Sequence, residues 1–172
     1  MRFSLCNEVV RELSFAAQCD LAATLGYQGI ELAPFTLGDA PHRLAPSEIA
    51  ALRRAASDAG VAITSLHWLL VAPAGLSITS GEATTRARTL DVIAGLVDLA
   101  AELGATHLVH GSPAQRVLPE GPDREAARQR GVDALAFAGE RARDAGVVYC
   151  IEPLDRGQTG FVNTIADAAE IV

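Results

Sequence analysis

The sequence has 172 residues, of which 49% are apolar and 20% are charged, and its formal net charge is −7. This composition suits one folded domain, because a disordered chain lacks the apolar side chains that form a core. The negative charge argues against a protein that binds duplex DNA, which needs a basic face to replace the counterions of the phosphates.

Five short apolar segments alternate with longer segments of helical character. Four of the five directly follow a Leu-Gly or Ala-Gly pair, in which the glycine can close a helix in the left-handed conformation. The segments are rich in β-branched residues and apolar on both faces, which is typical of buried parallel strands. We expect these strands at residues 3–6, 28–32, 61–66, 106–109 and 147–151.

The intervening segments predict helices. Apolar side chains recur at i, i+3, i+7 and i+10 in the second and third of them, starting from Ile49 and Ile93. Pro46 suits the first turn of the second helix, where a missing N–H has no cost. We expect a first helix over residues 13–25, a fourth over 123–143 and a fifth that begins near Thr164. Strands that alternate with helices predict an α/β protein with a parallel sheet.

Two folds fit five such units. A TIM (β/α)₈ barrel has eight units and about 250 residues, so this chain would supply roughly its first five as a single domain over residues 1–172. A five-stranded, flavodoxin-like doubly wound sheet is the alternative. The barrel is favoured because residues 6–9 form no glycine-rich phosphate loop, and because residues 163–172 stop without a helix cap. We therefore expect either a fragment or part of a longer protein.

Polar side chains stand at the carboxyl ends of four expected strands. Glu31 ends the second strand and His67 follows the third, His110 and Ser112 follow the fourth, and Glu152 follows the fifth. Parallel strands end on one side of a sheet, where barrel active sites are built. Carboxylate and imidazole groups are ligands and proton carriers in metal-assisted catalysis. These positions predict a metal-dependent active site.

Structural interpretations remain open for each of these residues. His67 could be a hydrogen-bonded histidine at a strand end, and Glu31 could cap a neighbouring helix. Glu152 is harder to explain in this way, because it follows an apolar strand and an unpaired buried carboxylate is costly. Trp68 could cover the helix tops or form an apolar wall for a sugar. Arginines at 116, 124 and 156 could meet a phosphate or could be solvated surface charges.

The cysteines and the hydropathy indicate the compartment. Cys6, Cys19 and Cys150 are scattered and odd in number, so neither a disulfide framework nor a structural zinc site is expected. The start of the sequence lacks the apolar stretch of a signal peptide, and no run approaches the ~18–20 apolar residues of a membrane span. We expect a cytoplasmic protein with no membrane partner.

The fifth strand and the segment after it resemble a signature of the xylose isomerase-like superfamily. Residues 151–159 and 161–164 carry this resemblance, and residues 29–32, 65–67, 99–105 and 110–111 resemble other parts of the same fold. The resemblance covers essentially the whole chain. Its nearest groups are the hydroxypyruvate isomerases, the ketose 3-epimerases and related sugar phosphate isomerases and epimerases.

The resemblance implies a divalent ion, manganese, magnesium or cobalt, held by two glutamates, an aspartate and a histidine. Only the first glutamate can be placed here, on Glu152, as a metal ligand and catalytic group; the other three ligands would lie beyond Val172. His67 and His110 match positions that line the substrate pocket, and Glu31 matches a second-strand position at its rim. Gln158 stands where several members have a glutamate that contacts the sugar. Independently of the resemblance, Trp68 is a candidate substrate-binding residue in its interpretation as an apolar wall.

These parts imply an isomerase or epimerase of small keto sugars, including phosphorylated ones. The ion would hold a carbonyl and its neighbouring hydroxyl and stabilise the enediolate that forms, while Glu152 transfers a proton. Two bases on opposite faces of the substrate give epimerisation, and one base that shuttles between carbons gives isomerisation. Both remain open, as does the dehydration of inosose-type cyclic sugars.

Two further alternatives come from other classes of protein. Endonuclease IV, a DNA-repair enzyme, shares the barrel and binds zinc through residues that would correspond to His67, His110 and Glu152, although the acidic charge argues against nucleic acid as a partner. A non-catalytic half-barrel is the other alternative, and its open sheet edge could pair with a second copy. We expect a small-molecule sugar as the substrate and a homo-oligomer.

Overall fold

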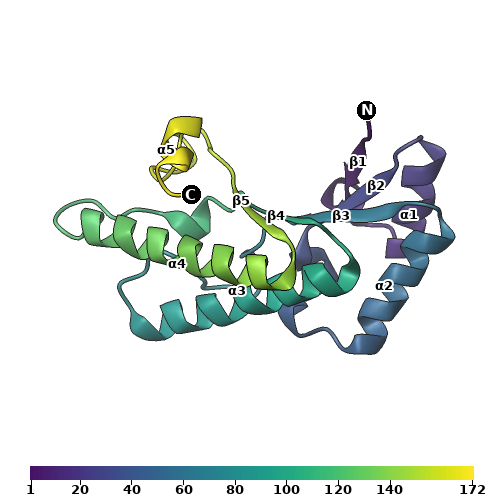
Figure 1. The fold of residues 1–172 in the computed structure, drawn as a ribbon, viewed down its shortest axis with the longest axis horizontal. Helices are drawn as coiled ribbons and strands as arrows, with labels where there is room; N and C mark the ends of the chain where they lie inside the picture. The colour runs from purple at the N-terminus through teal and green to yellow at the C-terminus, as the bar shows by residue number, and fades with distance from the viewer.

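The computed structural model describes residues 1–172 and contains one parallel five-stranded sheet. The strands follow one another across the sheet in the order of the sequence, each pairing with the next (Figure 1). They are β1 (Ser4–Cys6), β2 (Gly29–Leu32), β3 (Ala62–His67), β4 (His107–His110) and β5 (Val148–Ile151).

Four helices connect consecutive strands, and a fifth follows β5. In Figure 1 the first four lie below and to the right of the strands, whereas α5 and the C-terminus lie above α4. None of the helices is long and apolar enough to cross a membrane. The helices are α1 (Phe15–Thr24), α2 (Pro46–Asp58), α3 (Ala83–Leu103), α4 (Arg124–Ala145) and α5 (Ile165–Ala169).

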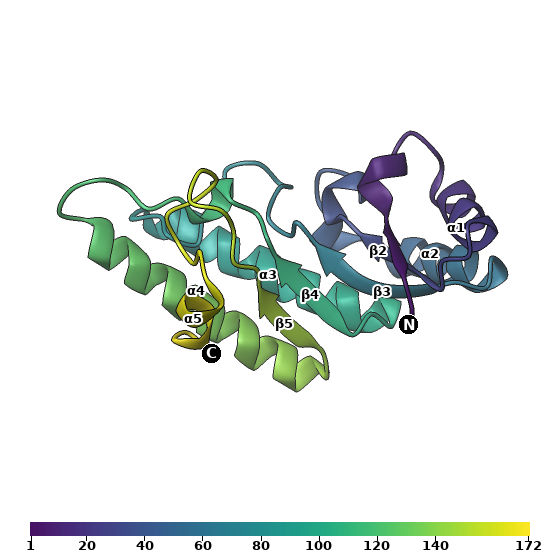
Figure 2. The ribbon, with the colours of Figure 1, turned by 90° about the horizontal axis from the view of Figure 1, so that it is seen from above.

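The topology is that of a TIM barrel. Crossovers between parallel strands are right-handed, so sequential strands place every connecting helix on the same face of the sheet. Accordingly α1 packs on α2, α2 on α3 and α3 on α4, as an outer layer around the curved sheet (Figure 2). The flavodoxin-like alternative is wrong, because that fold has the strand order 2-1-3-4-5 and helices on both faces. The sheet stays open, since β1 and β5 each pair with a single neighbour.

The predicted glycine junctions are confirmed. Gly26, Gly60, Gly104 and Gly146 follow the four connecting helices with φ angles of 82°, 74°, 78° and 73°, a left-handed conformation that side chains disfavour. The strands begin one residue later than predicted. At two of the junctions the reason is visible, because the amides of Val61 and Val147 donate back to carbonyls of the preceding helices and thereby close those helices.

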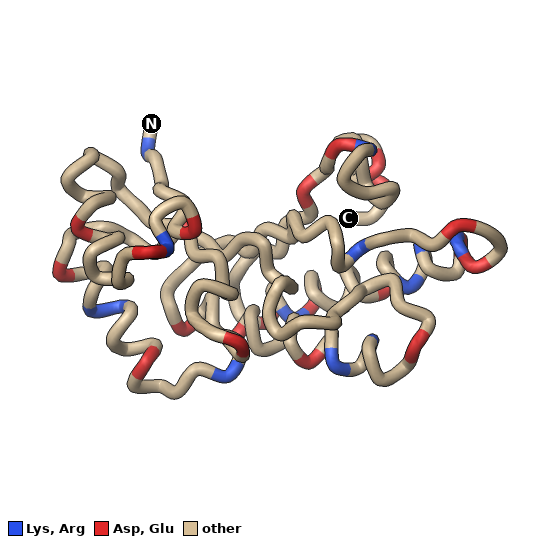
Figure 3. Tube along the Cα trace, turned by 180° about the vertical axis from the view of Figure 1, so that it is seen from behind, with Lys and Arg blue, Asp and Glu red and all other residues tan.

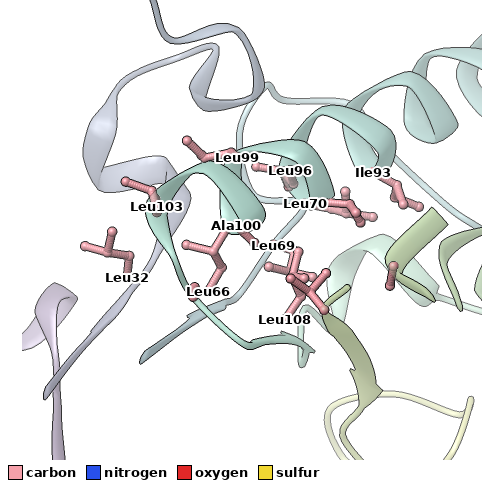
Figure 4. Packing of buried hydrophobic residues seen from close by; sticks show 14 of the residues in the cluster. Leu32, Leu66, Leu69, Leu70, Ile93, Leu96, Leu99, Ala100, Leu103 and Leu108 are labelled. Carbon is pink, nitrogen blue, oxygen red and sulfur yellow. The ribbon is translucent and has the colours of Figure 1, made fainter. Parts of the chain in front are cut away.

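The core fills the space between the sheet and α3 (Figure 4). Leu66 of β3 and Leu108 of β4 are fully buried, as are Leu96 and Ala100 of α3. Side chains alternate between the two faces of a strand, so the neighbours of Leu66 in the sequence point to the face that no connecting helix covers. That face carries the polar strand ends. On the outer surface, acidic and basic residues are interspersed (Figure 3).

Candidate functional site

Three neighbouring strands bring four polar side chains together. In the sheet register Cys6 of β1 lies beside Glu31 of β2, and Glu31 lies beside Ser65 of β3. His67 is two residues beyond Ser65 on the same strand, so it projects from the same face. Leu66 between them points to the helices, and this alternation separates a polar face from an apolar one.

The carboxylate of Glu31 is at the centre of this group. Its Oε1 accepts a hydrogen bond of 2.7 Å from the Ser65 hydroxyl, and its Oε2 accepts one of 3.0 Å from the Cys6 thiol. Nδ1 of His67 lies 3.5 Å from the same Oε2. Burial and the bond to Glu31 raise the pKa of the Cys6 thiol to about 12, so the thiol keeps its proton. Glu31 caps no helix, and that interpretation is wrong.

Glu8 is a member of the site that the sequence analysis missed. It lies in the 3₁₀ turn Asn7–Val10 after β1, and its Oε2 is 2.9 Å from Nε2 of His67. The imidazole of His67 therefore lies between two carboxylates. The signal was available in the sequence, because Glu8 follows the first strand by two residues and strand-end position identified the other site residues.

Asn7 holds this turn in place. Its side chain is almost completely buried; it accepts a hydrogen bond of 2.7 Å from the amide of Ala33 and donates one of 2.7 Å to the Thr36 hydroxyl. The turn after β1 is thus tied to the loop after β2. The turn carries Glu8, and the loop directly follows the strand that carries Glu31, so this contact fixes Glu8 relative to Glu31.

Trp68 follows His67 and borders the same strand ends. It has a left-handed φ of 55°, and 41% of its surface is exposed. Its ring meets Phe35, from the loop after β2, edge to face with 5.5 Å between the ring centroids. Two aromatic side chains therefore form an apolar surface at the strand ends, and a sugar contact at Trp68 stays a prediction.

His110 lies on the other face of the sheet. It shares the helix-facing side of β4 with Leu108 and is fully buried, with Nδ1 2.9 Å from the Tyr149 hydroxyl. Burial lowers the pKa of His110 to about 3, and the positive charge of Arg116 lowers it as well, so the imidazole is neutral. The structure does not bring His110 together with His67. A substrate contact at His110 stays a prediction, against which this burial argues.

Arg116 is a buried residue and not the solvated or phosphate-facing charge that the sequence suggested. The 3₁₀ turn Ala114–Arg116 directs its side chain inward, where Nη2 donates a hydrogen bond of 2.7 Å to the main-chain carbonyl of Glu152. Its Nε and Nη1 are also buried and have no partner. Arg124 and Arg156, by contrast, are exposed.

The side chain of Glu152 is exposed, so the expectation of a buried carboxylate is wrong. It continues the register beyond β5 and lies over Gly111, where a Cβ atom would overlap its Oε2. Gln158 is also exposed and lies in the turn after β5. Its main-chain N–H donates a hydrogen bond of 2.9 Å to the carbonyl of Asp155 and closes the turn, whereas its side-chain amide is free. The end of β5 thus presents one free carboxylate and, six residues later, one free amide.

Two places at the strand ends offer metal-ligand atoms. At the first, single atoms of Cys6, Glu31 and His67 lie within 4.8 Å of one another. At the second, Glu152 supplies a single exposed carboxylate, the donor type that Mg²⁺ and Mn²⁺ prefer. The two places differ in chemistry, because only the first contains sulfur and nitrogen donors.

The chain is similar to solved structures of the same fold. A D-psicose 3-epimerase crystallised in the presence of D-fructose superimposes with a TM-score of 0.81 at 20% identity, over 99% of this chain and 58% of that one. A protein from Sinorhizobium meliloti 1021 gives 0.74 at 26% identity, over 98% and 57%. A xylose isomerase-like TIM barrel protein from Mycobacterium smegmatis, in complex with magnesium, gives 0.62 at 20% identity, over 94% and 54%.

The chain thus spans 58% of the length of the epimerase that it resembles. No curated protein matches the sequence. The model of one protein family, described as xylose isomerase-like TIM barrel, matches residues 19–172. This match includes β2 to β5 and the strand-end residues Glu31, His67 and Glu152. The chain therefore belongs to the xylose isomerase-like TIM barrel family.

Proposed function

We propose that the chain forms part of the catalytic barrel of a metal-dependent isomerase or epimerase that acts on small keto sugars. The observation that carries this proposal is the free carboxylate of Glu152 at the carboxyl end of β5, where TIM barrels place catalytic groups. The fold shared with a D-psicose 3-epimerase supports the class of substrate.

The cofactor of the proposed reaction is a divalent ion such as manganese, magnesium or cobalt, and Glu152 is the residue of this chain that would hold it. Such an ion, when bound, stabilises the negative charge that develops on the oxygens of a keto sugar as the proton between them leaves. An exposed carboxylate without an ion-pair partner fits this role, since both of its oxygens are free. The magnesium complex of the Mycobacterium smegmatis protein supports the choice of metal.

Glu152 is also the proposed proton-transfer group. A carboxylate can take a proton from carbon only if it is held close to that carbon. The buried guanidinium of Arg116 fixes the main chain of Glu152 through the carbonyl, and Gly111 leaves room for the side chain above it. The main chain of Glu152 is thus held in place, while its carboxylate group has no hydrogen-bond partner and can move.

Other predicted residues would bind the sugar. The exposed side-chain amide of Gln158 can exchange hydrogen bonds with sugar hydroxyls from the turn after β5. Both ring nitrogens of His67 are buried and face Glu8 and Glu31, so we assign this residue no direct hydrogen bond to the sugar. Trp68 and Phe35 offer an apolar surface for the carbon–hydrogen face of the sugar. We do not assign this role to His110, because its ring is buried.

A zinc-nuclease site of the endonuclease IV type is less well supported. It would need His67, His110 and Glu152 around the metal, but β4 directs His110 to the helix-facing side of the sheet, away from the face that carries His67. The non-catalytic half-barrel and the inosose dehydratase remain as outcomes of the functional test.

Exchange of carbon-bound protons tests the proposal. We would incubate the full-length protein with Mn²⁺ and D-fructose, D-psicose or a ketose phosphate in D₂O, and follow deuterium incorporation by NMR. Deuterium at C3 would indicate an epimerase, deuterium at C1 an isomerase, and loss of water a dehydratase. We expect metal-dependent exchange that Glu152→Gln abolishes and Glu102→Gln, on the exposed side of α3, leaves unchanged. Absence of exchange, or exchange that survives Glu152→Gln, would overturn the proposal.

A further inference from the structure

We propose that Cys6, Glu31 and His67 form a binding site for a thiophilic divalent cation of the Zn²⁺ or Co²⁺ type, separate from the carboxylate at Glu152. The site lies at the ends of β1, β2 and β3, and each strand contributes one ligand. Thiolate and imidazole donors select such ions over Mg²⁺ and Ca²⁺, which bind oxygen. The proposal does not rest on the sugar chemistry of the barrel.

The spacing of the donor atoms fits a tetrahedral ion. Metal–ligand distances of about 2.0–2.3 Å place the ligand atoms of such an ion about 3.3–3.8 Å apart. Sγ of Cys6 lies 3.0 Å from Oε2 of Glu31, and that oxygen lies 3.5 Å from Nδ1 of His67. All three donor atoms lie within 4.8 Å of one another, so an ion between them needs Cys6 Sγ and His67 Nδ1 to approach by no more than about 1 Å. The fourth position would be open to water.

The residues around the donors are arranged as support for a metal site. Histidines that bind metals commonly direct their other ring nitrogen to a carboxylate, and ligating carboxylates are themselves hydrogen-bonded. Nε2 of His67 lies 2.9 Å from Oε2 of Glu8, which leaves Nδ1 to face the other donors. The Ser65 hydroxyl occupies Oε1 of Glu31 at 2.7 Å, which leaves Oε2 for an ion.

The group lacks a positive charge and complete hydrogen bonding. Both ring nitrogens of His67 and Oε2 of Glu8 are buried, and none of them makes a hydrogen bond of good geometry. The only ion-pair partner of Glu8 and of Glu31 is His67, so no arginine neutralises the two carboxylates. A cation that replaces the thiol proton would supply the missing charge and use the free nitrogen. The rival arrangement is a protonated His67 between the carboxylates, which binds no metal.

Cobalt titration of the full-length protein distinguishes these arrangements, because Co²⁺ bound to a thiolate gives a near-ultraviolet charge-transfer band. We expect a band that saturates at one equivalent, competition by Zn²⁺, and loss of the band in Cys6→Ser. Cys150→Ser is the matched control, since Cys150 is a partly buried strand cysteine outside the group, and it should leave the band unchanged. Glu8→Gln should weaken binding by about 10-fold or more.

Two further variants keep the test decisive. Glu31→Gln preserves the shape of a ligand and removes its charge, so it replaces Cys6→Ser if circular dichroism shows that the latter is unfolded. Glu152→Gln should leave the cobalt band intact, which separates this site from the proposed catalytic ion. A wild-type protein without the band, or a band that survives both Cys6→Ser and Glu31→Gln in folded protein, would overturn the proposal.

Discussion

Arg116 Nη2 donates a hydrogen bond of 2.7 Å to the main-chain carbonyl of Glu152, and the arginine side chain is completely buried. Burial lowers the pKa of this guanidinium, and the negative charge of Glu152 opposes the effect. In some proteins a buried charge fixes one particular geometry, and here the element that Arg116 contacts is the backbone at the end of β5. Arg116 is therefore a candidate positioning residue for Glu152.

Arg116→Met tests this relationship. Methionine keeps most of the side-chain volume but cannot donate a hydrogen bond, and the removal of an incompletely paired buried charge offsets part of the loss. We expect a folded protein in which Glu152-dependent proton exchange falls by about 10- to 100-fold, because small displacements of a catalytic group have effects of that size. The change should appear in kcat and not in KM. Arg124→Met, at an exposed site, should change neither constant, and an unchanged kcat in Arg116→Met would remove the positioning role.

The contrast between Glu152 and Arg116 also shows how far the sequence alone can go. Helix-closing glycines followed by short β-branched apolar segments located the strands, and the strand ends indicated Glu31, His67 and Glu152, because these are local properties of the chain. The direction of the Arg116 side chain depends on its contact with Glu152, which lies 36 residues later, just after β5. No local pattern in the sequence encodes that contact. Glu8 could have been found, because it occupies the same type of strand-end position.

His110 illustrates a second limit of strand-end reasoning. The end of a strand is shared by residues of both faces, and a shift of one residue changes the face. The predicted fourth strand ended at Val109 and placed His110 in the loop; β4 includes His110, which thereby falls in line with Leu108 on the helix side. The position of His110 near the end of the fourth strand was thus predicted to within one residue, whereas the direction of its side chain depends on the strand register.

Burial of neutral His110 predicts a pH-dependent stability. Its pKa of about 3 lies below the ordinary value of 6.5, so the unfolded chain binds a proton that the folded chain does not. The contribution is fully present above pH 6.5 and is lost as the pH falls toward 3. Between pH 7 and pH 5 this residue should remove about 2 kcal/mol from the free energy of unfolding.

Denaturant unfolding at the two pH values measures this effect. His110→Gln should show a smaller loss of stability than the wild type between pH 7 and pH 5, by about 2 kcal/mol. His107→Gln removes an exposed histidine three residues away and should retain the full wild-type loss. Equal losses in all three proteins would mean that His110 is protonated in the folded state.

Gly111→Ala separates the fold from the carboxylate of Glu152. An added Cβ would overlap Oε2 of Glu152, the end of a flexible exposed side chain that can rotate away. We expect the free energy of unfolding to change by no more than about 1 kcal/mol, because the clash is relieved without moving the backbone. Glu152-dependent exchange should nevertheless fall. Chemical denaturation and the NMR exchange assay, run on the same preparation, check both halves; an unaffected exchange rate would show that Glu152 works from a different rotamer.

The turn after β5 is held against α4 by a contact between Phe161 and Gly131, and this contact predicts unequal effects of the same substitution in one helix. An alanine Cβ at Gly131 would lie 2.8 Å from the Phe161 ring, which is buried, whereas a Cβ at Gly139 of the same helix meets nothing. Alanine is favoured over glycine in helices by about 1 kcal/mol, so Gly139→Ala should raise the free energy of unfolding.

Gly131→Ala receives the same helical gain but must displace a packed ring, and overpacking of this kind costs about 1–3 kcal/mol. We expect it to be less stable than Gly139→Ala by that amount in thermal or urea unfolding. Displacement of Phe161 also moves the turn that carries Gln158, so KM for the sugar should rise in Gly131→Ala alone. Equal stabilities for the two variants would mean that the Phe161 ring can leave α4 freely, and the turn would then not be a fixed wall of the proposed substrate site.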